Sequence, residues 1–331
     1  MTVRERPGIY AEYRVKSNAR TGGGGITVGV AAQALGDESE IKSVISYPDA
    51  LSRYGLSNMT ALVKILFYNG AGKILAAPVE DGGYAAAFAE LIESGADVII
   101  CDSSAQTVIS AMKTALESTR YCLGIAEFDG TAEQCVSLAQ SMNFERLVIC
   151  GNTTARTGAL AAAMAGAVAF GNNPMTAFNG CALLGCGGLE NNYTEQEIEA
   201  LIAGGITPVE NDGRNVCIVR GITTRTSTEG VPDKSLRELN TVLVAVNVLK
   251  SVNDALKIRF AGGHNDALTR GAIRSQVVVE LENKLKAGII EGYGNVAAAA
   301  DLSDETVCNV SFEFTAAHGL NSIQLTAYLE V

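Results

Sequence analysis

The two ends of the chain show the strictest alternation of apolar and polar residues. In residues 322–331 every second side chain is apolar, namely Ile323, Leu325, Ala327, Leu329 and Val331. Near the other end, the same alternation places Ile9, Ala11, Tyr13 and Val15 on one side. A period of two is typical of a half-buried strand. Because chain ends fray unless something holds them, each end is predicted to join a sheet, in its own subunit or in another copy.

Between about residues 22 and 211, short apolar runs alternate with stretches of helical period. Predicted strands cover 26–32, 73–78, 97–101, 121–126, 146–150 and 182–184. Predicted helices lie between them, at 58–68, 83–93, 105–118, 132–142, 157–170 and 195–203. This alternation predicts an α/β layer with a mostly parallel sheet. Val98–Cys101 and Leu147–Cys150 are apolar throughout, which is typical of strands covered on both faces.

The pattern changes after residue 206, where longer helices are predicted. A strand at 216–220 precedes a helix at 235–258 that would start at Pro232–Asp233, with an apolar stripe of Leu236, Leu239, Leu243, Val246, Leu249, Val252 and Leu256. A second helix at 267–287 has a stripe of Ile273, Val277, Leu281 and Leu285, and it would stop at Gly288. A strand at 306–315 is predicted to form a β-hairpin with the closing strand through residues 316–321.

These patterns divide the chain into three parts. Residues 1–20 are expected to form a strand arm and linker, and residues 21–210 a mixed-sheet α/β domain. Residues 211–331 are expected to form an α+β domain that ends in a second strand arm at 322–331. The predicted fold class is therefore α/β, extended by an α+β domain.

Composition limits the classes of partner. The chain has 331 residues, of which 47% are hydrophobic and 18% charged, so a folded protein with sizeable cores is expected. A net charge of −11 argues against a nucleic-acid partner, because phosphate binding needs a basic face. No apolar run reaches the length of a membrane span, and residues 2–7 are too polar for a secretion signal. We expect assembly in a cytoplasm, without membrane contact by this subunit.

The eight cysteines are predicted to be small buried hydrophobic residues with reduced thiols. None forms a C-x-x-C pair, and most lie in apolar runs. Cys181 and Cys186 are close in sequence, but the further ligands of a metal site are missing. No disulfide or metal site is predicted.

Motifs for catalysis and cofactor binding are incomplete. The run Gly22–Gly25 fits neither dinucleotide nor P-loop spacing, and Gly72-Lys73 lacks the following hydroxyl residue. The only histidines, His264 and His318, lie in glycine-containing loops. Ser103-Ser104 lacks the G-x-S-x-G context of a nucleophile.

The acidic residues near the end of the chain lack the spacing of a calcium loop. Asp301, Asp304 and Glu305 have no central glycine, so a solvated turn is expected. No catalytic, cofactor or metal site is predicted.

Four segments in order resemble contractile phage tail sheath proteins. Pro7-Gly-Ile-Tyr10 resembles the opening of that family, and 41–55 resembles its strand, acidic helix start and aromatic-glycine segment. Residues 61–70 resemble the helix that follows and ends in Asn-Gly. Val219-Arg-Gly-Ile-Thr-Thr-Arg225 is similar to the [IV]-R-x-[IVL]-T-T element. Residues 80–200 match only in their α/β texture.

This resemblance implies a subunit of a contractile sheath, in a myovirus-type tail or a tail-like bacteriocin. Such a sheath polymerises helically around an inner tube, stores energy in an extended state and contracts to drive the tube through a cell envelope. The first and last strands of each subunit would enter neighbouring copies and complete a sheet there. The middle domain would resemble subtilisin in fold and lie outside. It would carry no catalytic triad, so no enzyme activity is expected. The carboxyl-terminal domain would lie innermost.

The resemblance also implies partners: further copies of the chain, the inner tail tube protein, and baseplate and tail terminator proteins. Residues 17–25, including Gly22, Gly23, Gly24 and Gly25, and the loop with Gly319 would be hinges between arms and body. Arg270, Arg274, Lys284 and Lys286 on the second long helix are candidates to face an acidic tube; a solvated helix face is the alternative. The assembly would be released as part of a virion tail or tail-like particle.

Two other classes of protein remain open from the sequence. An α/β enzyme or small-molecule binding protein that oligomerises through edge strands predicts a deep polar pocket at the carboxyl ends of the strands. A structural tube or shell protein predicts strand exchange without contraction. Electron microscopy of the purified protein separates these alternatives.

Overall fold

The computed structural model describes residues 25–36, 38–80, 82–171, 173–260 and 263–317. Both predicted strand arms, with Ile9, Ala11, Tyr13, Val15, Ile323, Leu325, Ala327, Leu329 and Val331, lie outside the described residues. The same is true of Gly22, Gly23, Gly24, Gly319 and His318.

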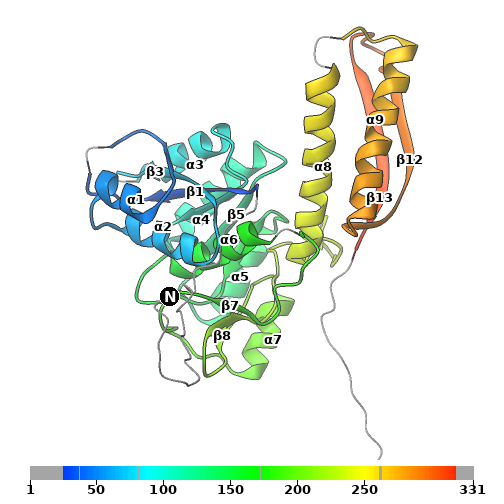
Figure 1. The fold of residues 1–331 in the computed structure, drawn as a ribbon. Helices are drawn as coiled ribbons and strands as arrows, with labels where there is room; N and C mark the ends of the chain where they lie inside the picture. The colour runs from blue at the N-terminus through cyan, green and yellow to red at the C-terminus, as the bar shows by residue number, and fades with distance from the viewer. Residues whose placement is uncertain (1–24, 37, 81, 172, 261–262, 318–331) are drawn as a thin grey trace, which may run out of the picture.

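A six-stranded sheet forms the centre of the α/β body, with strand order β2-β3-β1-β4-β5-β6. Its strands are β1 (Thr27–Ala32), β2 (Lys42–Val44), β3 (Lys73–Pro78), β4 (Val98–Cys101), β5 (Leu123–Glu127) and β6 (Leu147–Cys150). All neighbours are parallel except β2, which runs antiparallel to β3. The expected mixed α/β sheet is therefore confirmed (Figure 1).

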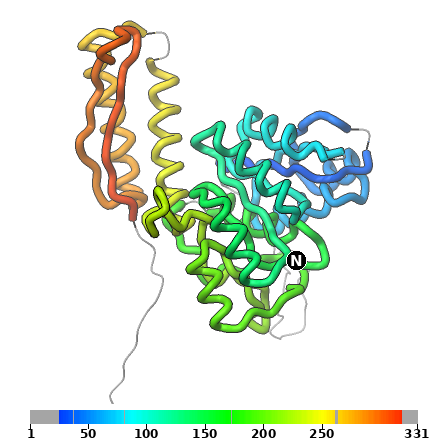
Figure 2. The backbone as a smooth tube through the Cα atoms, turned by 180° about the vertical axis from the view of Figure 1, so that it is seen from behind, coloured from blue at the N-terminus to red at the C-terminus, as the bar shows by residue number. Residues whose placement is uncertain are grey.

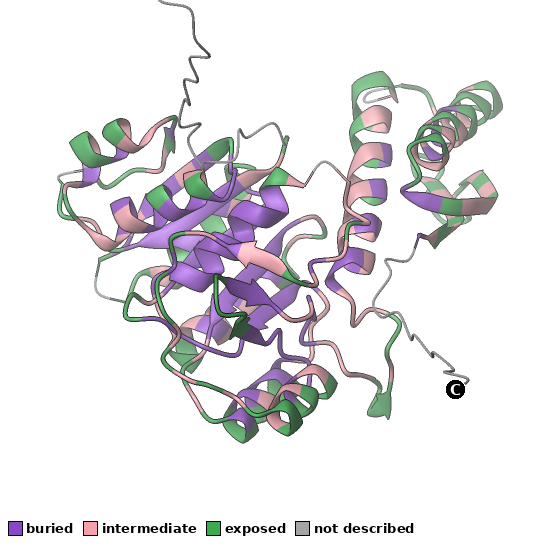
Figure 3. Cartoon of the chain, turned by 60° about the horizontal axis from the view of Figure 1, so that its bottom comes forward, coloured by how far each residue is buried: buried purple, intermediate pink, exposed green. Residues whose placement is uncertain are grey.

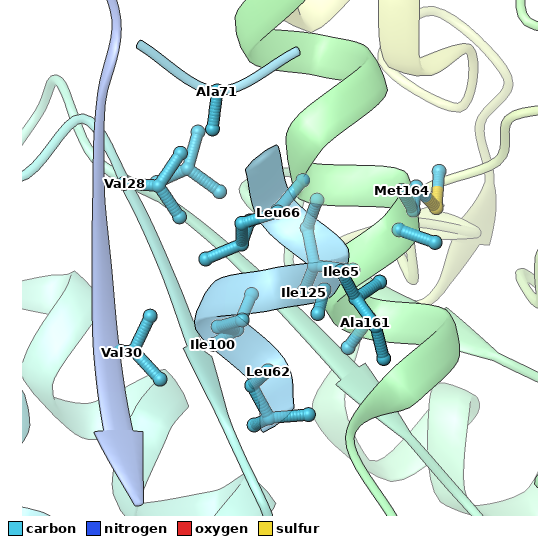
Figure 4. Close-up of a cluster of buried hydrophobic side chains, with 14 of the residues drawn as sticks. Val28, Val30, Leu62, Ile65, Leu66, Ala71, Ile100, Ile125, Ala161 and Met164 are labelled. Carbon is cyan, nitrogen blue, oxygen red and sulfur yellow. The ribbon is translucent and has the colours of Figure 1, made fainter. Parts of the chain in front are cut away.

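Helices cover both faces of this sheet. Since successive strand residues point to opposite faces, each strand contributes side chains to a core on either side. Val28 and Val30 of β1 belong to one core and Ala31 to the other. The first core is closed by α2 (Asn58–Tyr68) and α6 (Ala159–Phe170), as Figure 4 shows. The second is closed by α3 (Tyr84–Glu93), α4 (Gln106–Glu117) and α5 (Ala132–Met142).

Helix α6 is buried on all sides. Every residue from Ala159 to Ala169 is buried, which explains its run of alanines. Its Gly166 lies against α2: a Cβ there would approach the Asn69 Cβ to 2.6 Å. The small side chains therefore let two helices approach closely under the sheet.

The family-like segment 41–55 folds as its pattern indicates. Strand β2 is followed by α1 (Tyr47–Tyr54), which has Asp49 in its first turn and is capped by Ser46. Gly55 follows with φ 60°, a conformation that favours glycine.

A smaller antiparallel sheet of order β7-β9-β8 extends the body. It consists of β7 (Cys181–Leu183), β8 (Val209–Asn211) and β9 (Val216–Ile218), and α7 (Glu195–Ala203) lies between β7 and β8 in sequence. The short strands β10 (Ser227–Thr228) and β11 (Val231–Pro232) pair with each other. The domain boundary predicted after residue 210 passes through this sheet, because Val216 and Ile218 of β9 are buried in the first core.

The carboxyl-terminal domain is a pair of layers beside the body: two long helices against a two-stranded sheet (Figures 1 and 2). Its elements are α8 (Leu239–Phe260), α9 (Ala267–Lys286), β12 (Ile290–Ala300) and β13 (Cys308–Ala316). Its core consists of Val244, Val248, Val252, Val277, Leu281, Ile289 and Ile290. Gly288, with φ 68°, ends α9 as predicted.

The predicted start of α8 was wrong. Backbone hydrogen bonds from Thr223 N to Arg237 O (2.8 Å) and from Leu239 N to Gly221 O (3.0 Å) tie the preceding segment to residues 221–223. Residues 235–236 form a turn rather than the first turn of a helix. The helix therefore begins at Leu239, and Pro232 belongs to β11. Part of the predicted stripe was also wrong, since Leu249 is 40% exposed.

Strand β12 was not predicted from the sequence. Strand 306–315 was expected to pair with the closing strand, whereas β13 pairs with β12. Pairing with residues 322–331 lies outside the described residues.

All eight cysteines lie in the described part of the chain. They are free thiols, and six of them are buried, as predicted. Among the described residues, no helix has the length and apolar character needed to cross a membrane.

Candidate assembly interface in the carboxyl-terminal domain

The hairpin β12–β13 is a two-stranded sheet with unpaired edges. Its antiparallel register places Tyr293 opposite Phe314 and Ala298 opposite Val310, with irregularities on either side of Gly292–Gly294. In the part of the chain that the structure describes, each strand pairs only with the other. The outer edge of each strand therefore offers free backbone N–H and C=O groups to a further strand.

The inner face of this sheet is incompletely covered. Val310, Phe312 and Phe314 of β13 pack against the α8–α9 core but are only half-buried. The alternate residues Asn309, Ser311, Glu313 and Thr315 are exposed. A two-stranded sheet is marginal by itself. Here α9 supports it, and further strands would cover more of its apolar face.

Polar side chains connect α9 to β12 and also to α8. Arg274 Nε donates to Val296 O of β12 at 2.8 Å, and Tyr293 OH donates to Glu282 at 2.5 Å. Lys284 Nζ donates to Asn247 Oδ1 of α8 at 2.7 Å. Burial lowers the pKa of Lys284. Arg259 of α8 is hydrogen-bonded to Gln276 of α9.

The four predicted tube-facing cations occupy different environments. Arg274 and Lys284 use donors within the domain, and Arg270 donates to Asn265 O at 2.9 Å. Lys286 is exposed in the last turn of α9. Contact of these residues with a tube stays a prediction.

The segment that resembles the [IV]-R-x-[IVL]-T-T element joins the body to α8. Arg220 forms a salt bridge with Glu238 at 2.6 Å, one residue before the helix. Thr223 Oγ1 donates to Leu236 O at 2.8 Å, and Thr224 Oγ1 donates to Phe144 O at 2.9 Å. The motif therefore holds the base of the second domain against the first.

A further ion pair connects the domains along α8. Lys250 of α8 pairs with Asp97, which precedes β4 and also accepts a hydrogen bond from Thr27 N at 2.9 Å. Of the predicted hinge, Gly25 is described: it is exposed, and a Cβ there would meet no atom within 4 Å. The chain is thus uncrowded where it enters β1.

A polar cluster lies at the carboxyl ends of β1 and β4, where an α/β enzyme would bind its ligand. The Asp102 carboxylate accepts hydrogen bonds from Gln33 N (3.0 Å), Asn58 Nδ2 (3.0 Å) and Tyr84 OH (2.7 Å). Burial, and then the bond to Asp102, raise the pKa of Tyr84. Three internal donors engage this carboxylate, which fixes loops rather than presenting a base to a substrate.

The other candidate catalytic groups are not assembled. Ser103 Oγ accepts from Ala105 N at 3.3 Å, and His264 is exposed in the other domain. In the described ranges, no group of three or more His, Cys, Asp or Glu side chains is placed to hold a metal ion. Asp301 and Asp304 form the expected exposed turn and accept hydrogen bonds from nearby residues such as Ser303 and Thr306.

Comparison with known proteins gives a family for the central part of the chain. Residues 77–224 match the model of the phage tail sheath protein central domain. No curated protein matches the sequence. Three solved structures share the fold over nearly the whole chain.

The anti-feeding prophage contributes two of these structures. A chain of its six-fold symmetrised baseplate has a TM-score of 0.77 and 16% identity, and a chain of its contracted helical sheath has 0.72 and 15%. Each comparison covers 99% of this chain and 100% of the other. A sheath tail protein from Desulfitobacterium hafniense has a TM-score of 0.70 and 11% identity, over 94% of this chain and 100% of that one. The resemblance to sheath proteins is thereby confirmed.

Proposed function

Because residues 77–224 match the phage tail sheath protein central domain, we propose that the chain is a structural subunit of a contractile sheath. The subunit would polymerise helically around an inner tube and contract to drive that tube through a target cell envelope. It would have no catalytic role.

The observation that carries this proposal is the two-stranded sheet β12–β13. Its outer edges are unpaired among the described residues, and its row of Val310, Phe312 and Phe314 is half-buried. The two arms of the sequence, 1–20 and 322–331, have the alternation of strands. An arm from another copy would add to a free edge by backbone hydrogen bonds, while alternate side chains fix its register.

The strength of such a contact fits a polymer that must survive a large rearrangement. An arm of about nine residues forms roughly five ladder bonds, at ~1 kcal/mol net each, plus apolar burial. The glycines at 22–25 and Gly319 would let the arms stay paired while the bodies rotate. Energy would be stored in the extended polymer, which persists because its escape is slow.

The remaining partners follow from the same proposal. The carboxyl-terminal domain would face the tube, with Arg270, Arg274, Lys284 and Lys286 as the residues nearest to it. Baseplate and terminator proteins would contact the two ends of the polymer. Assembly would take place in the bacterial host cytoplasm, before release in a virion tail or tail-like particle.

Proline substitutions in the arms test the proposal. Ala11→Pro and Ala327→Pro each remove a backbone donor from a predicted strand. We expect the wild type to form hollow tubes in negative-stain micrographs, and each variant to remain dispersed with unchanged circular dichroism. Ala19→Pro, in the predicted linker, is the matched control and should assemble. Normal tubes from both arm variants would contradict strand exchange.

A further inference from the structure

Two surfaces at opposite ends of the six-stranded sheet are complementary in charge. The first lies beside β1 and β3, near the β2 end of the strand order, and the second lies beyond β6. Figure 1 shows the helices of these two ends, α1 at the left and α7 at the bottom of the body. Neither surface belongs to the β12–β13 interface.

The first surface, the leucine rim, consists of Leu35, Leu56, Lys64 and Arg156. The two leucines are 76% and 80% exposed, and all four residues border a hollow of about 870 Å³. The Lys64 ammonium lies over the rings of Tyr47 and Tyr68, at 5.4 and 5.7 Å from their centroids. Large exposed apolar side chains in one place indicate a contact surface.

The cations of the leucine rim are available to a partner. Within the described residues, neither Lys64 nor Arg156 has a carboxylate within ion-pair distance; Arg156 donates only to the amide oxygen of Asn58, at 3.3 Å. One carboxylate, Glu80, also borders the hollow. The rim therefore presents two unpaired cations beside two protruding leucines.

The second surface, the α5–α7 groove, has the opposite charge. Its volume is about 870 Å³, and the residues that line it include the small apolar Ala132, Val136 and Ala200. Glu133 and Glu197 flank it, and no lysine or arginine borders it among the described residues.

The sequence around this groove is acidic. Residues 186–213, which contain α7, include no lysine or arginine. Their acidic residues are Glu190, Glu195, Glu197, Glu199, Glu210 and Asp212. The apolar residues of the groove could therefore contact the leucines of the rim, while the glutamates of the groove pair with the cations of the rim.

We propose that the leucine rim of one copy docks into the α5–α7 groove of a second copy of this chain. One chain carries both halves of the contact, at opposite ends of one sheet. A contact between two different patches does not close on itself unless the rotation makes a ring, so it propagates into an open helical polymer. The proposal rests on the proposed function only in taking a second copy of the chain as the occupant of the α5–α7 groove. It adds a contact between the α/β bodies of two copies to the proposed exchange of their terminal arms.

Charge reversal of each half tests the contact in the full-length chain. The rim variant is Lys64→Glu with Arg156→Glu. The groove variant is Glu133→Lys with Gln196→Lys, which replaces two residues that line the groove. It spares Glu197 because that residue caps α7. A control pair, Lys234→Glu with Lys257→Glu, reverses two exposed lysines elsewhere. Circular dichroism verifies folding.

Self-association is measured by sedimentation at about 0.1 M salt, where exposed charges still interact over ~10 Å. We expect the rim and groove variants each to associate at least about tenfold more weakly than wild type, and the control pair to be unchanged. An equimolar mixture of the rim and groove variants should regain association, because the acidic rim of one variant then meets the basic groove of the other. The chain with all four substitutions should also associate, because it carries both the acidic rim and the basic groove.

Three outcomes would overturn the proposal: rim and groove variants that associate like wild type, a mixture as weak as its components, or a wild type that does not associate.

A chain lacking residues 1–20 and 318–331 separates this proposal from strand exchange. If association needs the arms but not the charges, the body contact is refuted and the arms stand. If charge reversal and rescue occur while the arms are dispensable, strand exchange is refuted and the body contact stands.

Discussion

The α/β body and the carboxyl-terminal domain bury their strands to different extents. In the body, all residues of β4 and β6 are buried, because helices cover both faces of the sheet. Strand β4 lies between β1 and β5, and the outer edge of β6 pairs with Thr207 and Thr224 through backbone hydrogen bonds. In the second domain, no residue of β13 is fully buried, and only Ile290 of β12 is. Figure 3 shows the contrast between the buried central strands and the second domain. The body is closed by its own elements, whereas no third strand pairs with β12–β13 in the described part of the chain.

The largest expected effect is in the core of the body. Phe88 of α3 is fully buried against the sheet, so Phe88→Ala leaves a cavity and should lower the free energy of unfolding by about 3–5 kcal/mol. Denaturant unfolding of the monomer measures this loss. A loss of unfolding free energy below about 1 kcal/mol would show that the core around Phe88 is less tightly packed than its full burial indicates.

A comparable effect is expected from pH, through Glu127 at the end of β5. This carboxyl accepts hydrogen bonds from Gly158 N (2.9 Å), Ala161 N (3.0 Å) and Leu160 N at the start of α6. Burial raises the pKa of Glu127 to about 7 from its usual 4.5, although the hydrogen bonds oppose the shift.

The folded state therefore binds more protons than the unfolded state between pH 4.5 and about 7. Across this window the free energy of unfolding should fall as pH rises, by about 3 kcal/mol, and should not change further above it. Unfolding measured at several pH values checks this slope. Glu127→Gln should remove it, and the same slope in that variant would assign it to another group.

The hairpin tip should respond to pH with the opposite sign. Hydrogen bonds from Ser303 lower the pKa of Asp301, and those from Thr306 lower the pKa of Asp304. Their contribution is present above the usual carboxyl pKa and is lost as pH falls through the lowered values. Amide exchange at the tip should therefore rise, relative to its intrinsic rate, on acidification below pH 4. Unchanged protection there would contradict this reversal.

A smaller effect on the monomer is expected in the second domain. Phe314→Ala removes a half-buried ring and should cost the isolated subunit about 1–2 kcal/mol. The cost should be larger in the polymer, because the strands that we propose are added there would complete the burial of that ring. Comparing denaturant midpoints of subunit and polymer measures both; an equal cost in the two forms would contradict closure by other copies.

The smallest expected effect is at the ion pair between the domains. Lys250 is 40% exposed, so Lys250→Met should cost at most about 1 kcal/mol. Asp97 should remain in place through its bond to Thr27 N. Thermal unfolding at low and high salt measures the difference; a loss of several kcal/mol would show that this pair fixes the two regions together.

The sequence predicted the body better than the second domain, for a physical reason. Continuous apolar runs such as Val98–Cys101 identify strands that helices cover on both faces, and all five parallel strands were found this way. In β12, glycines and the alanines at 297–300 give neither alternation nor strong strand propensity. That segment is a strand because β13 and α9 hold it, which is information from tertiary structure.

The candidate interface was predicted only in part for the same reason. The alternation at the chain ends pointed to strand addition, but the acceptor sheet could not be recognised while β12 was missing from the prediction. The junction of Lys250 with Asp97 joins residues 153 positions apart, and no local pattern indicates such a pair. The positions of the two surfaces at opposite ends of the sheet required the strand order.

Hydrogen exchange of the β12 and β13 backbone, compared between isolated subunits and assembled polymer, shows directly whether other copies complete this sheet. We expect amides on the outer edges of Ile290–Ala300 and Cys308–Ala316 to exchange readily in the subunit and to become protected on assembly, while amides of β4 are protected in both. Outer-edge amides that exchange equally fast in subunit and polymer would contradict the account.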